Sequence, residues 1–167
     1  MGAANLERPR TTHGTRHLNC KAFIIALSVG ERIEASASTA GMKATAQTTG
    51  DAFSVSEGTS PADMNGPPPH AHSYTTGTFY VLEGTLHVTV GDREIDTPAG
   101  GYILVPPGVV HTFASTSDEP VRFLNINAPG GWENYLRDLA EAMRSGTMPG
   151  TPEFAQIVAK YDFVVPA

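Results

Sequence analysis

The sequence has little cysteine and few basic residues, and it lacks a long hydrophobic run. Its 167 residues include a single cysteine, Cys20, which excludes an internal disulfide and any metal cluster built from cysteine alone. Lysine and arginine number 11 against 17 aspartates and glutamates, a net charge of −6, which argues against a nucleic-acid-binding protein. Because six histidines stand beside one thiol, a bound transition metal would have to be held by imidazole.

The longest apolar run near the start, residues 22–27, is too short for the core of a signal peptide or for a bilayer span. We therefore expect a soluble, cytoplasmic protein without membrane contact. The first residues are polar and show no periodicity, so residues 1–28 are predicted to form a flexible or strand-exchanging arm. His13 and His17 lie in this arm and are expected to be solvated.

The pattern beyond residue 29 is typical of an all-β protein. Glycine and proline, with 17 and 13 residues, favour many turns over long helices. Short β-rich runs alternate with Gly, Pro and Asp, and the predicted strands are 32–38, 42–48, 52–57, 78–82, 86–90, 93–96, 102–105, 109–115 and 121–127. Residues 132–144 and 153–161 have helical spacing, which predicts a short helical C-terminal segment.

Two segments carry histidines in a pattern that suits a metal. Residues 66–72 read Gly-Pro-Pro-Pro-His-Ala-His, and the prolines impose an extended chain. His70 and His72 then project to the same side, with Cα atoms about 6.5 Å apart, and can bind one ion. In the second segment, a Pro-Pro-Gly turn at 106–108 leads into a strand that carries His111 on an inward face. Taken alone, His111 fits a core histidine with a hydrogen-bond partner.

Together the two segments resemble the two motifs of the cupin superfamily, and the surrounding residues resemble the small, quercetin-dioxygenase-like cupins. The resemblance covers about residues 30–128. In the first motif the His-x-His pair and the stretch 77–84 have the usual spacing, but the glutamate ligand of the family falls on Gly77. In the second motif Ser115 stands where asparagine is expected, and the matching residues are Gly100, Pro106, Gly108 and His111.

The resemblance implies a cupin β-barrel, a jelly-roll-like double sheet, over residues 29–128, with helices in 129–167 covering it. It carries over His70, His72 and His111 as metal ligands. Three neutral imidazoles without a carboxylate favour a divalent transition metal, Zn, Ni, Fe or Cu, over Mn or Mg. The alternative is a site that has decayed or works without metal.

Strand alternation supplies candidates for the interior of the barrel. Glu57, which we place on the same face as Phe53 and Val55, is the one carboxylate expected near the cavity and is a candidate general base. Tyr74 follows the histidine pair and is a candidate for orienting a substrate, although a loop tyrosine at the rim is the plain alternative. The residues expected to contact the substrate are Phe79, Phe113, Asn125, Asn127 and Trp132.

These features predict a metal-dependent enzyme that acts on a small aromatic or polyketide-like molecule with an enol or carbonyl group, in a dioxygenase-like oxidation. A non-oxidative cyclase, isomerase or dehydratase is the first alternative, and a non-catalytic ligand-binding cupin is the second. A metal-free cyclase that uses Glu57, Tyr74 or the histidines is a further possibility. Because small cupins commonly pair, we expect a homodimer.

Overall fold

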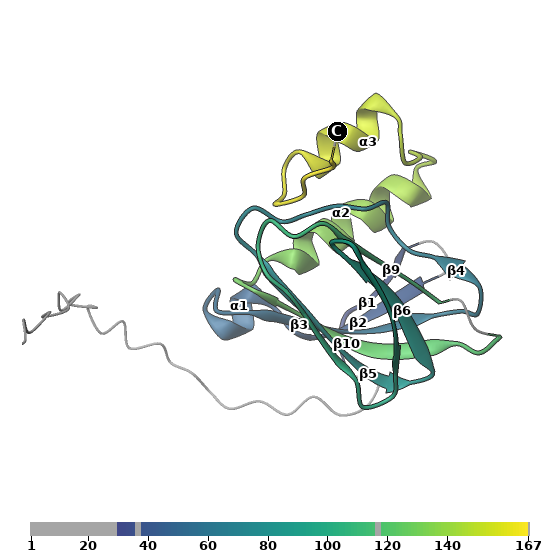
Figure 1. Cartoon of the computed structure of the whole chain (residues 1–167). Coiled ribbons are helices and arrows are strands. Elements are labelled where there is room, and N and C mark those ends of the chain that lie inside the picture. Colours follow the sequence, from purple (N-terminus) through teal and green to yellow (C-terminus); the bar gives the residue numbers. More distant parts are fainter. Residues whose placement is uncertain (1–29, 36–37, 116–117, 167) are drawn as a thin grey trace, which may run out of the picture.

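Ten described strands form two antiparallel sheets (Figure 1). This computed structural model describes residues 30–35, 38–115 and 118–166, so the predicted arm, with His13, His17 and Cys20, lies outside the described residues. The larger sheet runs in the order β1 (Arg32–Ala35), β2 (Ser38–Ala44), β3 (Ser54–Ser60), β10 (Val121–Ala128), β5 (Thr76–Glu83) and β8 (Tyr102–Val105). The smaller sheet runs in the order β4 (Met64–Asn65), β9 (His111–Ser115), β6 (Thr85–Val90) and β7 (Arg93–Pro98).

The two sheets confirm the all-β, jelly-roll-like prediction. The predicted strands at 86–90, 102–105 and 121–127 agree with β6, β8 and β10 to within one residue. Among the described residues no strand ladder joins one sheet to the other, so these strands form a double sheet rather than one closed barrel.

The hydrophobic core lies between the two sheets. It is built from alternate residues of each strand, because successive side chains point to opposite faces. β5 contributes Phe79 and Val81, and β6 contributes Leu86 and Val88. Val81, Leu86 and Val88 have no exposed surface, and burying a side chain of this kind contributes about 1.5–3 kcal/mol. This core holds the sheets together and gives the histidine-bearing segments a rigid base.

β3 presents small residues to the interior instead of apolar ones. Its buried positions are Ser54, Ser56, Gly58 and Ser60. A Cβ atom at Gly58 would lie only 2.7 Å from the ring of Phe123, so the strand stays small where the aromatic ring needs room. The predicted placement of Glu57 was therefore wrong. Glu57 points away from the interior, where its carboxylate pairs with Lys43 at 3.2 Å and Arg122 at 3.4 Å.

The predicted strand at 42–48 ends early, at Ala44, and a short helix follows, α1 (Ala46–Thr49). Thr45 and Thr48 form a reciprocal capping box at the start of this helix. Gly50 ends it in the left-handed conformation, with φ of 63°. Local capping therefore overrides the β-forming tendency of the threonines here.

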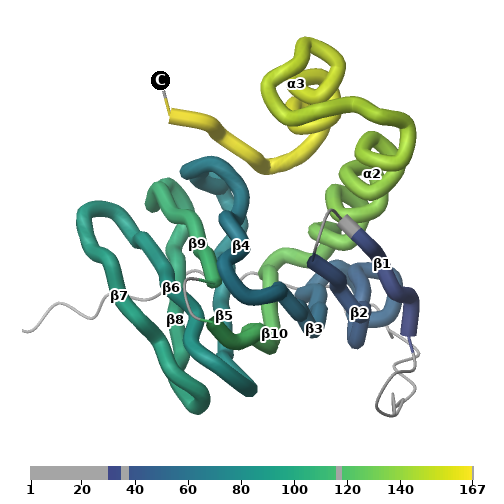
Figure 2. The backbone as a smooth tube through the Cα atoms, turned by 90° about the vertical axis from the view of Figure 1, so that its right-hand side faces the viewer, coloured from purple at the N-terminus to yellow at the C-terminus, as the bar shows by residue number. Residues whose placement is uncertain are grey.

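Two helices follow the sheets, α2 (Trp132–Arg144) and α3 (Pro152–Val158), and they lie at one end of the double sheet (Figure 2). The predicted helix at 132–144 is confirmed, and the second is shorter than predicted. Thr151 caps α3 by accepting the N–H of Phe154, and Pro152 occupies the first turn, where its missing N–H costs nothing. No helix in the described part of the chain is long and apolar enough to cross a membrane.

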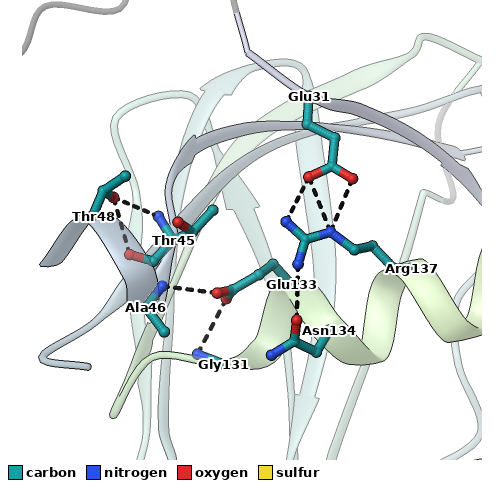
Figure 3. A network of polar contacts seen from close by, with 8 residues as sticks. All are labelled: Glu31, Thr45, Ala46, Thr48, Gly131, Glu133, Asn134 and Arg137. Carbon is teal, nitrogen blue, oxygen red and sulfur yellow. Dashed lines mark hydrogen bonds and ion pairs between the residues drawn. The ribbon is translucent and has the colours of Figure 1, made fainter. Parts of the chain in front are cut away.

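A buried carboxylate fixes the start of α2 (Figure 3). Glu133, only 2% exposed, accepts the N–H of Ala46 at 2.8 Å and of Gly131 at 3.1 Å. One turn further on, Arg137 pairs with Glu31 at 2.6 Å, which ties the helix to the residue before β1. These contacts hold α2 against the sheet and so place Trp132, its first residue.

Replacing Glu133 by alanine is expected to lower the free energy of unfolding by about 2–3 kcal/mol, because two N–H groups lose a charged acceptor. Glu133→Gln keeps one amide oxygen and should lose about half as much. Arg137→Ala, at a largely exposed ion pair, should cost at most about 1 kcal/mol. Urea denaturation followed by circular dichroism measures all three, and an unchanged midpoint for Glu133→Ala would contradict the anchoring role.

Candidate metal centre

Three histidines from two segments meet at one end of the space between the sheets. His70 and His72 lie in the extended segment between β4 and β5, and His111 begins β9. A backbone bridge joins His70 and His111, each N–H donating to the other's carbonyl, at 3.0 and 2.8 Å. All three side chains are buried, with 3% exposure each. The ring centroids lie 4.4 to 5.3 Å apart.

The Nδ1 atom of every ring faces a backbone carbonyl. His70 Nδ1 lies 3.0 Å from the carbonyl oxygen of Pro68, and His111 Nδ1 lies 3.1 Å from that of Val109. His72 Nδ1 makes a short hydrogen bond to the carbonyl oxygen of Asp162. Because a carbonyl oxygen only accepts, each Nδ1 has to carry the ring proton. Each Nε2 is then left with a free lone pair.

The electrostatics of the cluster keep the rings of His70 and His111 neutral. Burial, together with the neighbouring His111 and His72, lowers the pKa of His70 to about 3 against the opposing effect of the Pro68 carbonyl. Burial also lowers the pKa of His111. Neutral imidazole is the form that binds a metal ion.

The donor set fits a metal ion. One ligand atom from each histidine lies within 4.8 Å of the other two, and no other group of three His, Cys, Asp or Glu side chains in the described residues meets this condition. A ligating histidine usually donates its second N–H to a carbonyl or carboxylate, as all three do here. His70, His72 and His111 could therefore hold one metal ion.

Aromatic rings pack against two of the three histidines. Phe163 stacks on His70, with ring centroids 4.2 Å apart and planes inclined by 4°. Trp132 meets His72 edge to face at 4.9 Å. Sequence reasoning found Trp132 but missed Phe163, because nothing in the pattern after α3 indicates that the chain returns to residues 70–72.

Asp162 was also missed, and it makes four contacts with the segment that begins at His72. Its carboxylate accepts the N–H of Ser73 at 2.6 Å, of Tyr74 at 3.0 Å and of Thr75 at 2.9 Å. Burial raises the pKa of Asp162, but these hydrogen bonds outweigh burial and hold the pKa below its usual value. Asp162 is therefore an ionised residue that fixes the turn after His72.

A cavity of about 320 Å³ opens between the two sheets and helices α2 and α3. Its walls are mostly apolar, with His70 the one histidine on its surface and with no charged side chain among the lining residues. Four of the five expected substrate contacts line it, namely Phe79, Phe113, Asn125 and Trp132.

The other expected contact, Asn127, lies behind the cavity wall. It is buried, and its Nδ2 donates to Oδ1 of Asn125 at 2.6 Å. Asn125 Nδ2 in turn donates to the carbonyl of Thr78 at 3.2 Å. Asn127 therefore orients the amide of Asn125.

Neither predicted acid–base residue reaches the cavity. Glu57 lies on the outer face of β3, as described above. Tyr74 is 64% exposed and does not line the cavity, which agrees with a tyrosine at the rim. His87 lies outside this site, where it is partly exposed and pairs with Asp96 at 2.7 Å.

Gly77 is buried in β5, between Asn127 of β10 and Val105 of β8. Its backbone does not require glycine, since its φ lies outside the left-handed region. A Cβ atom there would meet only Oδ1 of Asn127, at 3.5 Å, an ordinary contact. The missing side chain is therefore not imposed by the fold at this position.

Replacing Gly77 by glutamate is expected to add a carboxylate beside the histidines and to raise the affinity for Mn²⁺ by about tenfold, because carboxylate suits Mn²⁺ better than imidazole does. Gly77→Gln is the matched control, equal in length and uncharged. Isothermal titration of both variants with Mn²⁺ measures the effect. Equal affinities would show that the side chain at this position does not reach the ion.

The comparisons with known proteins agree with this geometry. The family described as Cupin domain matches residues 60–127. Quercetin 2,3-dioxygenase of Bacillus subtilis (strain 168) is 30% identical over 84 residues, which is 50% of this chain and 25% of that protein. Residues 60–127 of the chain thus form a cupin domain. This cupin is also 43% identical over 82 residues to the probable oxidoreductase patJ of Penicillium expansum, a match that covers 47% of this chain and 25% of patJ.

Solved structures support the same fold for this cupin. KdgF from Halomonas sp. superposes with a TM-score of 0.60 at 11% identity, covering 68% of this chain and 99% of that one. An RmlC-like cupin from Shewanella frigidimarina NCIMB 400 gives a TM-score of 0.56 at 18% identity, covering 69% and 98%. At these identities the likeness concerns the fold.

Proposed function

We propose that this cupin is a metal-dependent enzyme that oxidises a small aromatic or polyketide-like substrate carrying an enol or carbonyl group, in a dioxygenase-like reaction. The observation that carries the proposal is the group of three buried histidines beside a largely apolar cavity. The partial likeness to a quercetin 2,3-dioxygenase supports oxidative chemistry, although the match covers only 25% of that enzyme.

His70, His72 and His111 would hold the ion, for which Zn, Ni, Fe and Cu are the candidates. When bound, such an ion polarises a substrate oxygen as a Lewis acid and, if it is redox-active, gives access to dioxygen. The chain supplies the rest of the site. It keeps His70 and His111 neutral, fixes the tautomers of all three rings through backbone carbonyls and keeps water away from their buried faces.

The cavity walls would bind and orient the substrate. Phe79 and Phe113, whose ring centroids lie 5.4 Å apart, offer an apolar surface for a flat ring system. The side-chain amide of Asn125 donates one N–H to the backbone carbonyl of Thr78. Its second N–H would then be able to donate to a substrate oxygen. Burial raises the pKa of Tyr135 to about 12, so this cavity residue stays a neutral phenol at physiological pH.

A non-oxidative reaction of the same enolate, such as cyclisation, isomerisation or dehydration, is the second candidate. The all-histidine donor set favours it, because such a set suits Zn and Ni as well as Fe. A metal-free cyclase has less support, because Glu57 and Tyr74 lie away from the cavity.

The test is metal analysis of protein purified without chelator, followed by oxygen uptake with flavonols and β-diketones. The proposal expects about one transition-metal ion per chain and metal-dependent oxygen uptake. Turnover without oxygen uptake would favour the second candidate. Wild-type protein that binds none of the four metals would contradict both.

We also propose that the protein is a homodimer in the cytoplasm. The support is the sequence pattern of residues 1–28, which predicts an arm suited to strand exchange. Sedimentation velocity of the full chain and of a variant lacking residues 1–28 tests the dimer. The proposal expects a dimer that dissociates on deletion, and a monomeric full chain would contradict it.

A further inference from the structure

We propose that Asp162 is a positioning residue of the histidine cluster, and that with Phe163 and Val164 it holds His70 and His72 in the orientation that binds a metal ion. The proposal rests on the metal-binding role proposed above. It assigns a part in the site to a segment that lies 90 residues along the chain from the histidine it contacts.

Asp162 acts on His72 through two groups at once. Its backbone carbonyl takes the Nδ1 proton of the His72 ring, which sets both the tautomer and the ring plane. Its carboxylate takes the N–H groups of the next three residues, Ser73, Tyr74 and Thr75. One residue therefore fixes the side chain of the ligand and the backbone that leads away from it.

The next two residues act on the other part of the His-x-His segment. Phe163 lies flat on the His70 ring, with planes inclined by 4°. Val164 pairs with Ala71, each N–H donating to the other's carbonyl at 2.8 Å. Residues 162–164 thus contact all of residues 70–72.

The His-x-His segment depends on such support because it is not part of a sheet. Its backbone is held by two isolated bridges, His70 to His111 on one side and Ala71 to Val164 on the other, and by the N–H of Gly108, which donates to the carbonyl of His72 at 2.7 Å. Without the second bridge and the Asp162 contacts, His72 would have no backbone partner for its ring N–H in the described structure. A ligand that is free to turn binds a metal more weakly, and loss of a supporting residue typically costs about 10- to 100-fold in affinity.

The test compares Asp162→Ala with Asp138→Ala. Asp138 is a suitable control because it also binds the chain beyond α3, through Lys160 at 3.2 Å, but touches no histidine. Competition titration with Zn²⁺ and the visible spectrum of the Co²⁺ form report affinity and ligand geometry. Asp162→Ala should weaken Zn²⁺ binding about 10- to 100-fold and change the Co²⁺ spectrum, while Asp138→Ala changes neither. Wild-type affinity and spectrum in folded Asp162→Ala would overturn the proposal.

Asp162→Asn keeps the size of the side chain and provides a second test if the alanine variant does not fold. It removes one acceptor and the charge, so it should weaken Zn²⁺ binding in the same direction by a smaller factor. Unchanged Zn²⁺ binding by folded Asp162→Asn, together with a wild-type Co²⁺ spectrum, would count against the positioning role.

A measurement without metal separates this proposal from the proposed function. Nitrogen-15 NMR of the metal-free protein reports the His72 tautomer, and hydrogen exchange reports the Ser73 and Thr75 amides. The wild type should show the Nδ1–H tautomer and slow exchange. Asp162→Ala keeps the backbone carbonyl but loses the carboxylate that holds it in place, so the Ser73 and Thr75 amides should exchange faster and the His72 tautomer should become mixed. If wild type binds no Zn²⁺ but this difference appears, the proposed function fails and the positioning of His72 by Asp162 stands. If the variant matches wild type, the positioning role fails.

Discussion

Replacing His111 by alanine is expected to reduce Zn²⁺ affinity by more than about 100-fold, beyond what the loss of a supporting residue costs, and to abolish metal-dependent turnover. The reason is that only His70 and His72 remain, and two ligands that share one short segment cannot enclose an ion. Equilibrium dialysis with metal analysis measures the affinity.

His87→Ala is the matched control for this loss. It removes the same side chain from a partly exposed position, where His87 pairs with Asp96 outside the cluster. The control should keep wild-type metal content. If His111→Ala binds Zn²⁺ as tightly as His87→Ala does, the ligand assignment is wrong.

Filling the cavity should remove substrate binding while leaving the metal site intact. Ser56 lies on the inward face of β3, opposite Asn125 in the strand register, and lines the cavity. Ser56→Phe places a ring where the substrate is proposed to lie. We expect kcat/KM to fall by about 100-fold, the scale of a substrate displaced by about 1 Å, with Zn²⁺ affinity unchanged.

The fluorescence of Trp132 offers a direct readout of the same change. It is the one tryptophan of the chain, and it lines the cavity. A flavonol should quench its emission in the wild type and far less in Ser56→Phe. Thr59→Phe, on the exposed outer face of the same strand, is the control and should behave as wild type. Equal quenching in Ser56→Phe would show that the ligand binds elsewhere.

The sequence predicts those parts of the fold that are determined by residues close together in the chain. Three prolines before His70 impose the extended segment that turns His70 and His72 the same way, and the structure brings both to His111. The helix at 132–144 follows from its apolar spacing. In each case the residues responsible lie within a few positions of the feature they produce.

The site residues that were misplaced or missed depend on contacts between parts of the chain that lie far apart in the sequence. Glu57 was placed inward on the rule that apolar residues mark the interior face, but β3 faces the interior with serine and glycine, leaving room for Phe123. Asp162 and Phe163 were missed because their contacts with the histidines span 90 residues or more in the chain. No periodicity in the sequence records such a contact.

The most direct test of the metal centre is a crystal structure of the Zn²⁺-soaked protein with anomalous data at the zinc edge. We expect one strong anomalous peak per chain, about 2.0–2.1 Å from the Nε2 atoms of His70, His72 and His111. A strong peak at another position, such as His87 and Asp96, with none among these three rings, would contradict the metal centre.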